Sequence, residues 1–364
     1  MKIGILTFHC AHNYGAVLQA YALSSYLGNE GYNVEIIDYR SKAIVRHHEV
    51  IPSRAFRGLS HIKNMIRLIQ ILLFSLKRYK RAKVFDAFIN SLPLSERKYA
   101  ETKSLDDYDY IICGSDQIWN PSITKGYDSF YTGQVPTCGV YISYAASMEL
   151  TLFTDEQKTV ISSFLKNFRF ISVRESVLKD SLLPLIENKV IYQVLDPVFL
   201  LTKQQWHEFS SKNLLSDKYV LLYQVRRDKR CRKLAEGYSH KHNLKVVEIT
   251  AEAEHAWKAN QLGNLNPHEF VGLFENASAV VTTSFHGTAF SVLFNRPFKT
   301  VLFGSPGDGR ALDLINSLGI KDCTIPVNEY QSVIDKEWEV NSPLKSNEML
   351  NESKFFLQTA LSLQ

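Results

Sequence analysis

Cysteine is scarce in this sequence, and its five copies are odd in number and far apart. No two of them form a CxxC pair, and no His-x-x-x-His zinc pattern occurs. A disulfide framework needs paired cysteines and an oxidising compartment, so this usage predicts a protein of the reducing cytoplasm. We expect neither a disulfide scaffold nor a metal site.

Long hydrophobic runs are also missing. The most apolar stretch, residues 68–76, has about half of the ~20 residues that a membrane span needs. It is long enough to lie on a bilayer surface and too short to cross one. Residues 2–7 are typical of a strand and no signal peptide precedes them, so we expect a cytoplasmic protein.

Acidic residues are nearly absent from one segment. Between Arg40 and Lys83 there are twelve Lys or Arg and a single acid, Glu49, whereas the rest of the chain has 30 basic and 36 acidic residues. The segment also carries apolar residues at helical spacing from Ile62 to Tyr79. Two interpretations stay open: a solvated helix pair packed on its own domain, or a contact with an anionic membrane face or a lipid-phosphate-linked sugar. Nucleic acid is not expected, because aromatic residues are not interleaved with the charges.

Apolar strands and amphipathic helices alternate along most of the sequence, which is typical of a parallel, doubly wound sheet. A length of 364 residues is too great for one ordinary core. The prediction is an α/β protein with two Rossmann-like doubly wound domains facing a cleft. The predicted parts are an N-terminal domain over 1–205 with a basic helical insertion at about 41–92, a C-terminal domain over 206–345, and a last helix over 346–364 that folds back on the first domain.

The most informative stretch is Thr282 to Phe290. An apolar strand comes first, small hydroxyl residues follow, and a His-Gly pair opens an apolar helix. This order places His286 at the carboxyl end of a strand and at the start of a helix, where N–H groups and the helix dipole favour an anion. Histidine there can pair with an anion and move a proton near neutral pH.

Polar residues follow several other predicted strands. Open α/β sheets bind ligands outside the carboxyl ends of their strands, so these residues are expected to line the cleft between the domains. They are Asn13, Asp116, Asn120, Arg174 and Asp196.

Five motifs in the same order together resemble the polysaccharide pyruvyl transferase family, over about residues 3 to 303. They are Asn13–Leu23, Gly114–Pro121, Val173–Glu175, Asp196–Leu201 and Ser284–Gly287. The resemblance implies a GT-B-like fold and transfer of a pyruvyl group from phosphoenolpyruvate (PEP) to a sugar as a cyclic ketal. It implies no cofactor, and an acceptor in a capsule or exopolysaccharide precursor, in one interpretation lipid-linked at the inner membrane face.

By this resemblance His286, Asp116 and Arg174 are the predicted catalytic residues. His286 would bind PEP and handle protons, and the planar Arg174 fork would hold the phosphate or carboxylate of PEP. Asp116 would accept a proton from a sugar hydroxyl. The structural alternatives are helix caps for His286 and Asp116 and an ion pair with Glu175 for Arg174.

The predicted substrate-binding residues surround these three. Trp119 would stack on a sugar face, and Asn13 and Asn120 would bind sugar or PEP, with a core position and turns as the alternatives. Many family members have Arg-Leu before the His-Gly pair, and this chain has Ser284 and Phe285 there. Arg310 or Arg296 would replace the missing cation, with Ser284 and Gly287 next to the ligand.

Two further groups are assigned to structure rather than to chemistry. Asp196 precedes a proline, and a cap or hinge is its preferred role. His9, Cys10 and His12 match no common zinc set and show no sign of a reactive thiolate. Two rival functions remain: a GT-B-like glycosyltransferase with a sugar-nucleotide donor, and a non-catalytic protein that binds anionic saccharides.

Overall fold

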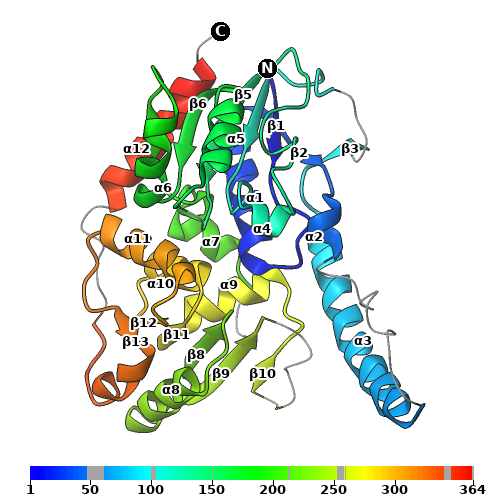
Figure 1. Cartoon of the computed structure of the whole chain (residues 1–364). Coiled ribbons are helices and arrows are strands. Elements are labelled where there is room, and N and C mark those ends of the chain that lie inside the picture. The colour runs from blue at the N-terminus through cyan, green and yellow to red at the C-terminus, as the bar shows by residue number, and fades with distance from the viewer. Residues whose placement is uncertain are drawn as a thin grey trace.

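Two parallel β-sheets form the frame of the protein, and the six strands of the second follow the same order as the first six strands of the other (Figure 1). The computed structural model describes residues 1–46, 61–99, 104–149, 151–211, 214–251, 258, 260–339 and 346–362. Residues 47–60 of the predicted basic insertion lie outside these ranges, as do the side chains of its apolar stripe from Ile62 to Leu73.

The first sheet has seven strands in the order β3-β2-β1-β4-β5-β6-β7. The strands are β1 (Lys2–Leu6), β2 (Asn33–Asp38), β3 (Leu94–Lys98), β4 (Tyr110–Cys113), β5 (Val140–Ala146), β6 (Phe168–Val173) and β7 (Ile191–Gln193). Between them lie α1 (Tyr14–Asn29), α2 (Lys42–Arg46), α3 (His61–Ile89), α4 (Pro121–Thr124), α5 (Asp155–Leu165), α6 (Ser176–Leu182) and the 3-10 turn η1 (Leu183–Leu185). The central strands are buried and apolar, as parallel strands covered on both faces must be.

The second sheet has six strands in the order β10-β9-β8-β11-β12-β13. The strands are β8 (Tyr219–Gln224), β9 (Lys245–Thr250), β10 (Gln261–Leu262), β11 (Ala279–Thr282), β12 (Phe298–Leu302) and β13 (Thr324–Pro326). Its helices are α8 (Lys229–Lys241), α9 (Pro267–Asn276), α10 (Phe285–Leu293), η4 (Pro306–Asp308), α11 (Gly309–Ser317) and η5 (Val327–Val333). The turn η2 (Pro197–Phe199) and α7 (Lys203–Phe209) join the sheets, and α12 (Ser346–Ser362) ends the described chain.

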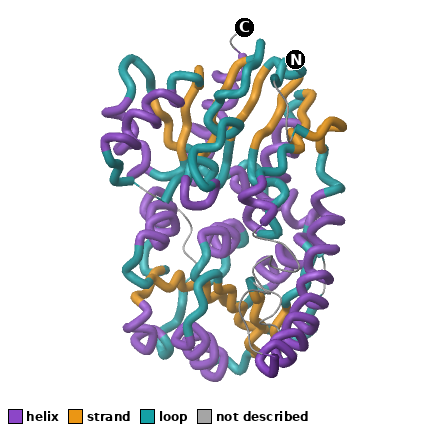
Figure 2. Tube along the Cα trace, turned by 45° about the vertical axis from the view of Figure 1, so that its right-hand side comes forward, coloured by secondary structure: helices purple, strands orange, loops and turns teal. Residues whose placement is uncertain are grey.

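Each sheet reverses its direction of strand addition once, between β1 and β4 in the first and between β8 and β11 in the second. Loops that leave the carboxyl ends of two such strands diverge to opposite faces of the sheet and open a crevice. In Figure 2 the two layers of strands lie one above the other with helices and loops between them. Residues that follow the strands of both switch points line one cavity.

Helix α1 joins the two halves through its first residue. The Tyr14 ring stacks on Phe270 of α9 with ring centroids 4.3 Å apart, and its hydroxyl donates to the Leu265 carbonyl at 2.9 Å. One apolar cluster contains buried residues from both sheets. The first turn of α1 is thus held firmly against the second half.

The C-terminal helix α12 packs on the first sheet, to which it returns from the second half (Figure 1). The Ser353 hydroxyl accepts a hydrogen bond from the Leu195 N–H at 2.9 Å. Phe356 is fully buried against Tyr144 and Tyr192. This helix covers the end of the sheet near β7 and ties the last residues of the chain to the first half.

Helix α3, within the predicted basic insertion, has 29 residues and runs down alongside the second half (Figure 1). The Arg81 guanidinium donates to the Gly263 carbonyl, just after β10, at 2.8 Å. The helix therefore does not pack on its own domain alone. Within the described ranges, no helix combines the length and apolarity that crossing a membrane would require.

Candidate functional site

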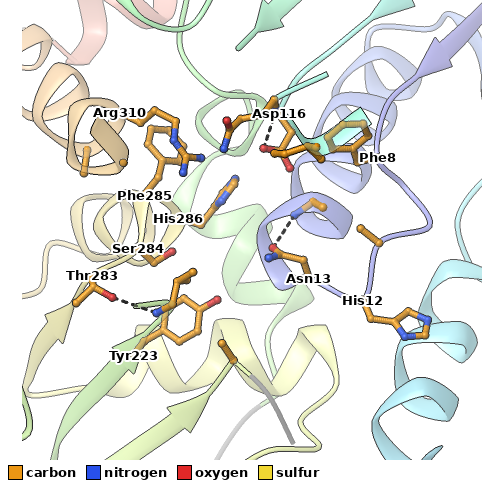
Figure 3. A pocket seen from close by; sticks show the side chains of 18 of the residues that line it. Phe8, His12, Asn13, Asp116, Tyr223, Thr283, Ser284, Phe285, His286 and Arg310 are labelled. Carbon is orange, nitrogen blue, oxygen red and sulfur yellow. Dashed lines mark hydrogen bonds between the residues drawn. The ribbon is translucent and has the colours of Figure 1, made fainter. Parts of the chain in front are cut away.

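A cavity of about 690 Å³ opens where the two halves face each other. The loop after β1 and the segment after β4 line it from the first half, and the starts of α10 and α11 line it from the second. Arg78 and Arg81 of α3 complete its wall. Figure 3 shows His286, Arg310 and Asp116 directed toward one space, with Asn13 facing them from the start of α1.

His286 is the second residue of α10. Ser284 caps this helix, since its hydroxyl accepts a hydrogen bond from the Gly287 N–H at 3.4 Å. The imidazole lines the cavity, and its Nε2 atom is buried without a hydrogen-bond partner among the described residues. A cap residue and the positive end of a helix thus fix a histidine next to a space that suits an anion.

Gly15 allows the imidazole to occupy this place. A Cβ atom at Gly15 would lie 2.0 Å from Nδ1 of His286, so only a glycine permits the first turn of α1 to approach the ring so closely. The Nε2 atom is directed the other way, 3.6 Å from Oδ2 of Asp196. The imidazole belongs to the second half of the molecule. It is held between two groups of the first half, the backbone at Gly15 and the carboxylate of Asp196.

Asp196 is completely buried and serves several groups at once. Its carboxylate caps η2, as predicted, by accepting a hydrogen bond from the Val198 N–H at 3.1 Å. It also accepts hydrogen bonds from Arg174 at 2.7 Å and from the Ser115 hydroxyl at 3.2 Å. Burial alone would raise the pKa of this carboxyl, but the neighbouring charges of His286 and Arg174 hold it well below its usual range. Asp196 is thus a fixed anion behind His286, a role that the sequence did not indicate.

Arg174 lies behind the cavity and does not line it. Its three nitrogens donate to Glu175 at 2.8 Å, Asp196 at 2.7 Å and Ser147 at 3.0 Å, and the guanidinium packs over Phe285 at 4.1 Å. The side chain is 3% exposed. The structure therefore places Arg174 in the alternative role, an internal ion pair, because two buried carboxylates and a hydroxyl engage its three nitrogens away from the cavity.

Arg310, unlike Arg174, lines the cavity. Its Nε atom is buried and no described residue accepts a hydrogen bond from it, while the Gln117 carboxamide lies 3.1 and 3.2 Å from its two terminal nitrogens. Burial lowers the pKa of this guanidinium, and the nearby charge of Arg174 acts in the same direction. Arginine stays protonated in proteins, so Arg310 is a desolvated cation with spare donors.

Asp116 lines the cavity from the segment after β4. Its backbone has a φ of 70°, and its Oδ1 atom accepts from the Gln117 N–H at 2.9 Å. The backbone carbonyl accepts from the Ser147 N–H at 3.0 Å, which fixes the turn. The carboxylate is half-buried and faces the open space, as a proton acceptor for a ligand must.

Trp119 and Asn120 do not contact the cavity, contrary to the prediction for both. Trp119 is 0% exposed, donates its indole N–H to the Tyr131 carbonyl at 2.9 Å and packs against Phe164. Asn120 is buried and caps α4, accepting from the Ser122 N–H at 3.0 Å. The chain turns so sharply after Asp116 that these side chains enter the core.

Two of the remaining predicted ligand residues line the cavity and one does not. Asn13 is exposed in the cavity and also caps α1, accepting from the Ala16 N–H at 3.3 Å. Ser284 lines the cavity, but Gly287 does not. A Cβ atom on Gly287 would lie 2.1 Å from Oγ1 of Thr282, so this glycine is needed for packing between α10 and β11.

The loop after β1 gives no metal site and no reactive thiol. His9 is buried and 3.1 Å from the Asp38 carboxylate, and burial raises the pKa of Cys10 to about 11. Cys10 therefore stays a neutral thiol at physiological pH. Among the described residues no group of three or more His, Cys, Asp or Glu side chains is placed to hold a metal ion.

Sequence reasoning missed several cavity residues. Arg78 and Arg81 appeared only as members of a basic segment, and His12 only as part of a discounted zinc set. Tyr223, at the carboxyl end of β8, also lines the cavity. For Tyr223 the strand-end rule was a usable signal, whereas nothing local in α3 indicates that it reaches a cavity between two sheets.

Comparisons with known proteins agree with this architecture. The family model described as polysaccharide pyruvyl transferase matches residues 13–299. No curated protein matches the chain. A UDP-N-acetylglucosamine 2-epimerase from Rickettsia bellii is similar in structure, with 10% identity, 100% of this chain and 96% of that chain covered, and a TM-score of 0.52. The UDP-GlcNAc 2-epimerase from Methanocaldococcus jannaschii has 10% identity, covers 99% and 100%, and has a TM-score of 0.50. At such identity the likeness shows the fold alone, a GT-B-like pair of Rossmann-like domains facing a cleft.

Proposed function

Because the chain belongs to the polysaccharide pyruvyl transferase family, we propose that it transfers a pyruvyl group from PEP to a sugar and forms a cyclic ketal. The acceptor in this proposal is part of a surface-polysaccharide precursor, such as that of a capsule or exopolysaccharide, made in the cytoplasm. The observation that carries the proposal is the single cavity that brings Arg310 and His286 from one half to Asp116 from the other.

The donor occupies the Arg310 and His286 side of the cavity. PEP has a phosphate and a carboxylate, and both need cationic or N–H donors in a partly desolvated site. Arg310 supplies a planar fork with a free Nε donor, and His286 adds a second group at the positive end of α10. Arg174 acts indirectly, because it holds the carboxylate of Asp196 in place. Oδ2 of that carboxylate lies 3.6 Å from Nε2 of His286.

The acceptor sugar lies against Asp116 and Asn13. A carboxylate that faces a cavity and is not tied to a cation can accept a hydroxyl proton, and the described residues place no Lys or Arg in an ion pair with Asp116. Asn13, exposed at the start of α1, offers an amide to the same sugar. The stacking role predicted for Trp119 is not part of this proposal.

The chemistry balances with these groups. The methylene carbon of PEP gains a proton, one sugar hydroxyl attacks the neighbouring carbon, and its proton passes to Asp116. The carbon–oxygen bond to phosphate then breaks, and a second hydroxyl of the same sugar attacks that carbon and closes the ring. Of the two protons that the hydroxyls lose, one ends on the methyl group and the other leaves with phosphate. No electrons are gained or lost, so the proposed reaction needs no redox cofactor.

Calorimetric titration of the purified protein with PEP, UDP-GlcNAc and a GDP-sugar tests the donor. We expect PEP to bind, and Arg310→Gln to weaken its binding by roughly 10- to 150-fold, the equivalent of one charge-assisted hydrogen bond of about 1.5–3 kcal/mol. Arg296→Gln is a matched control, because Arg296 is a partly buried arginine just beyond the other end of α10. Tight binding of a sugar nucleotide with no binding of PEP would contradict the proposal.

Release of phosphate from PEP in the presence of saccharide acceptors tests the chemistry. We expect Asp116→Asn to keep PEP affinity while turnover falls by roughly 10²–10⁴-fold, as is usual when a general base is removed. His286→Ala should reduce both PEP affinity and turnover. Undiminished turnover in the His286 variant would exclude the proposed role of the imidazole.

A further inference from the structure

The wall of the cavity formed by α3 and the β1–α1 loop carries cations that the donor does not use. Arg78 and Arg81 line this wall together with His12. Figure 3 shows His12 next to α3 and Arg310 on the opposite side, with His286 and Asn13 between them. The cavity therefore has two cationic ends, and PEP accounts for only one of them.

Arg81 is a fixed cation, and the described part of the chain supplies it with no anionic partner. It is 7% exposed and lies 4.9 Å over the Tyr14 ring and 4.6 Å over Phe85. Within the described ranges its guanidinium donates to three neutral oxygens, the Gly263 carbonyl at 2.8 Å, the Tyr14 hydroxyl at 3.3 Å and the His12 carbonyl at 3.5 Å. No carboxylate of a described residue forms an ion pair with it.

Asp86, an acidic residue of the same helix, is already engaged by another group. The Asp86 carboxylate lies 3.0 Å from Nε2 of His12. Burying a cation without a negative partner is costly unless something supplies the missing charge. Because packing on two aromatic rings holds the guanidinium rigidly at the cavity, the missing charge is best supplied by an anionic group of a ligand in that cavity.

We propose that Arg81, with Arg78, forms a second anion subsite, which binds the phosphate or diphosphate ester through which the acceptor sugar is attached to its carrier. This inference rests on the proposed function, since it takes the Arg310 side as the donor end. The planar guanidinium fork matches phosphate oxygens in pairs. A volume of about 690 Å³ lies within the range of roughly 300–1,000 Å³ for ligand sites, and PEP alone, a three-carbon phosphate, fills only part of it.

The same ester occurs on a lipid diphosphate and on a nucleotide diphosphate, and both are probed. Calorimetric titrations use inorganic pyrophosphate, UDP and geranyl diphosphate, each without and with saturating PEP. We expect at least one diphosphate to bind one-to-one in the presence of PEP. Arg81→Gln should weaken that binding at least tenfold and leave PEP affinity within twofold. Arg310→Gln should show the reverse pattern.

Lys80→Gln is the matched control, because Lys80 is an exposed residue of the same helix that does not line the cavity. If Arg81→Gln does not fold, Arg78→Gln replaces it and should weaken diphosphate binding at least threefold. The acceptor class is identified by the probe that binds more tightly than pyrophosphate. UDP would indicate a nucleotide-linked acceptor, and geranyl diphosphate a lipid-linked one.

Two results separate the inference from the proposed function. Arg81-dependent diphosphate binding in a protein that does not bind PEP would leave the subsite standing and remove the PEP donor. Diphosphates that displace PEP one-to-one, and that depend on Arg310 and not on Arg81 or Arg78, would show a single anion site and overturn the inference. Absence of diphosphate binding by the folded wild type would overturn it as well.

Discussion

Replacing Gly15 with alanine tests whether the contact between the two halves positions His286. The added Cβ atom would lie 2.0, 2.4 and 2.6 Å from Nδ1, Cε1 and Cγ of the imidazole, whereas ordinary van der Waals contact begins at 3.4 Å. The ring or the first turn of α1 has to move by about 1.4 Å. Neither can move freely, because Tyr14 is stacked on Phe270 and the imidazole lies 3.6 Å from Asp196.

The expected cost falls on function more than on stability. A displacement of about 1 Å at a reacting group reduces turnover by roughly 10²-fold. Overpacking costs about 1–3 kcal/mol, but alanine is about 1 kcal/mol better than glycine within a helix. The net loss in the free energy of unfolding is therefore about 0–2 kcal/mol, and the variant is expected to fold.

Calorimetry with PEP, phosphate release with acceptor, and urea unfolding measure these effects. Gly28→Ala, in the same helix, is the matched control, because its Cβ atom would meet only a Val34 methyl group at 3.9 Å. It should keep PEP affinity and turnover and gain up to about 1 kcal/mol of stability. A double variant with His286→Ala should be no less active than His286→Ala alone, because the clash acts only through the ring.

The reasoning is refuted if Gly15→Ala binds PEP and turns over like the wild type. The contact of Gly15 with His286 would then not belong to the working state of the protein. An equal loss in Gly28→Ala would also refute it, since the effect would then come from the helix and not from the imidazole.

Three further predictions concern buried groups. Replacing Asp196 with asparagine should lower turnover more than PEP affinity. It should also lower the free energy of unfolding in urea by about 3–5 kcal/mol, because His286 and Arg174 lose a buried anion. Unchanged turnover and stability would exclude the role of Asp196 in positioning His286. Burial alone would raise the pKa of Asp38, but its contacts with His9 and Arg40 lower it to about 2. Since the pKa of Asp38 in the folded protein is below the unfolded value of 3.8, its contribution to stability is full above about pH 4. About 2 kcal/mol of it is lost as the pH falls toward 2. Urea unfolding across this pH range should show a smaller loss of stability in Asp38→Asn than in the wild type. Trp119→Phe should cost about 1–3 kcal/mol, since the Tyr131 carbonyl loses its donor, with an unchanged KM for acceptor; a raised KM at constant kcat would indicate sugar contact.

Strand-end positions predicted much of the cavity because the rule is geometric. In a parallel sheet the carboxyl ends meet at one edge, so Asn13 and Asp116 stand at one edge of the first sheet and His286 at the same edge of the second. The two edges face each other across the cavity. The alternation of apolar strands and amphipathic helices likewise predicted the two doubly wound domains of the fold, which is confirmed. Both signals are local, so they can be read along one sequence.

The direction of each side chain could not be read in the same way. Within one short segment Asp116 faces the cavity, while Trp119 enters the core and Asn120 caps a helix. Arg174 follows a strand as a ligand residue would, yet it binds the neighbouring Glu175 and two residues that follow other strands, Asp196 and Ser147. Spacing along the chain does not indicate the last two partners, so a ligand-binding arginine and an ion-paired arginine look alike in the sequence.

By itself the sequence determined where strands and helices form and which polar residues stand at strand ends, because hydrophobic periodicity and helix capping depend on neighbours in the chain. Only the tertiary structure decided that Gly15 leaves room for His286, that Asp196 lies behind that ring, and that Arg81 of a distant helix reaches the same cavity. These are contacts between halves of the molecule. They arise because apolar faces of α1, α3 and α9 pack together and bring remote charges into one desolvated space.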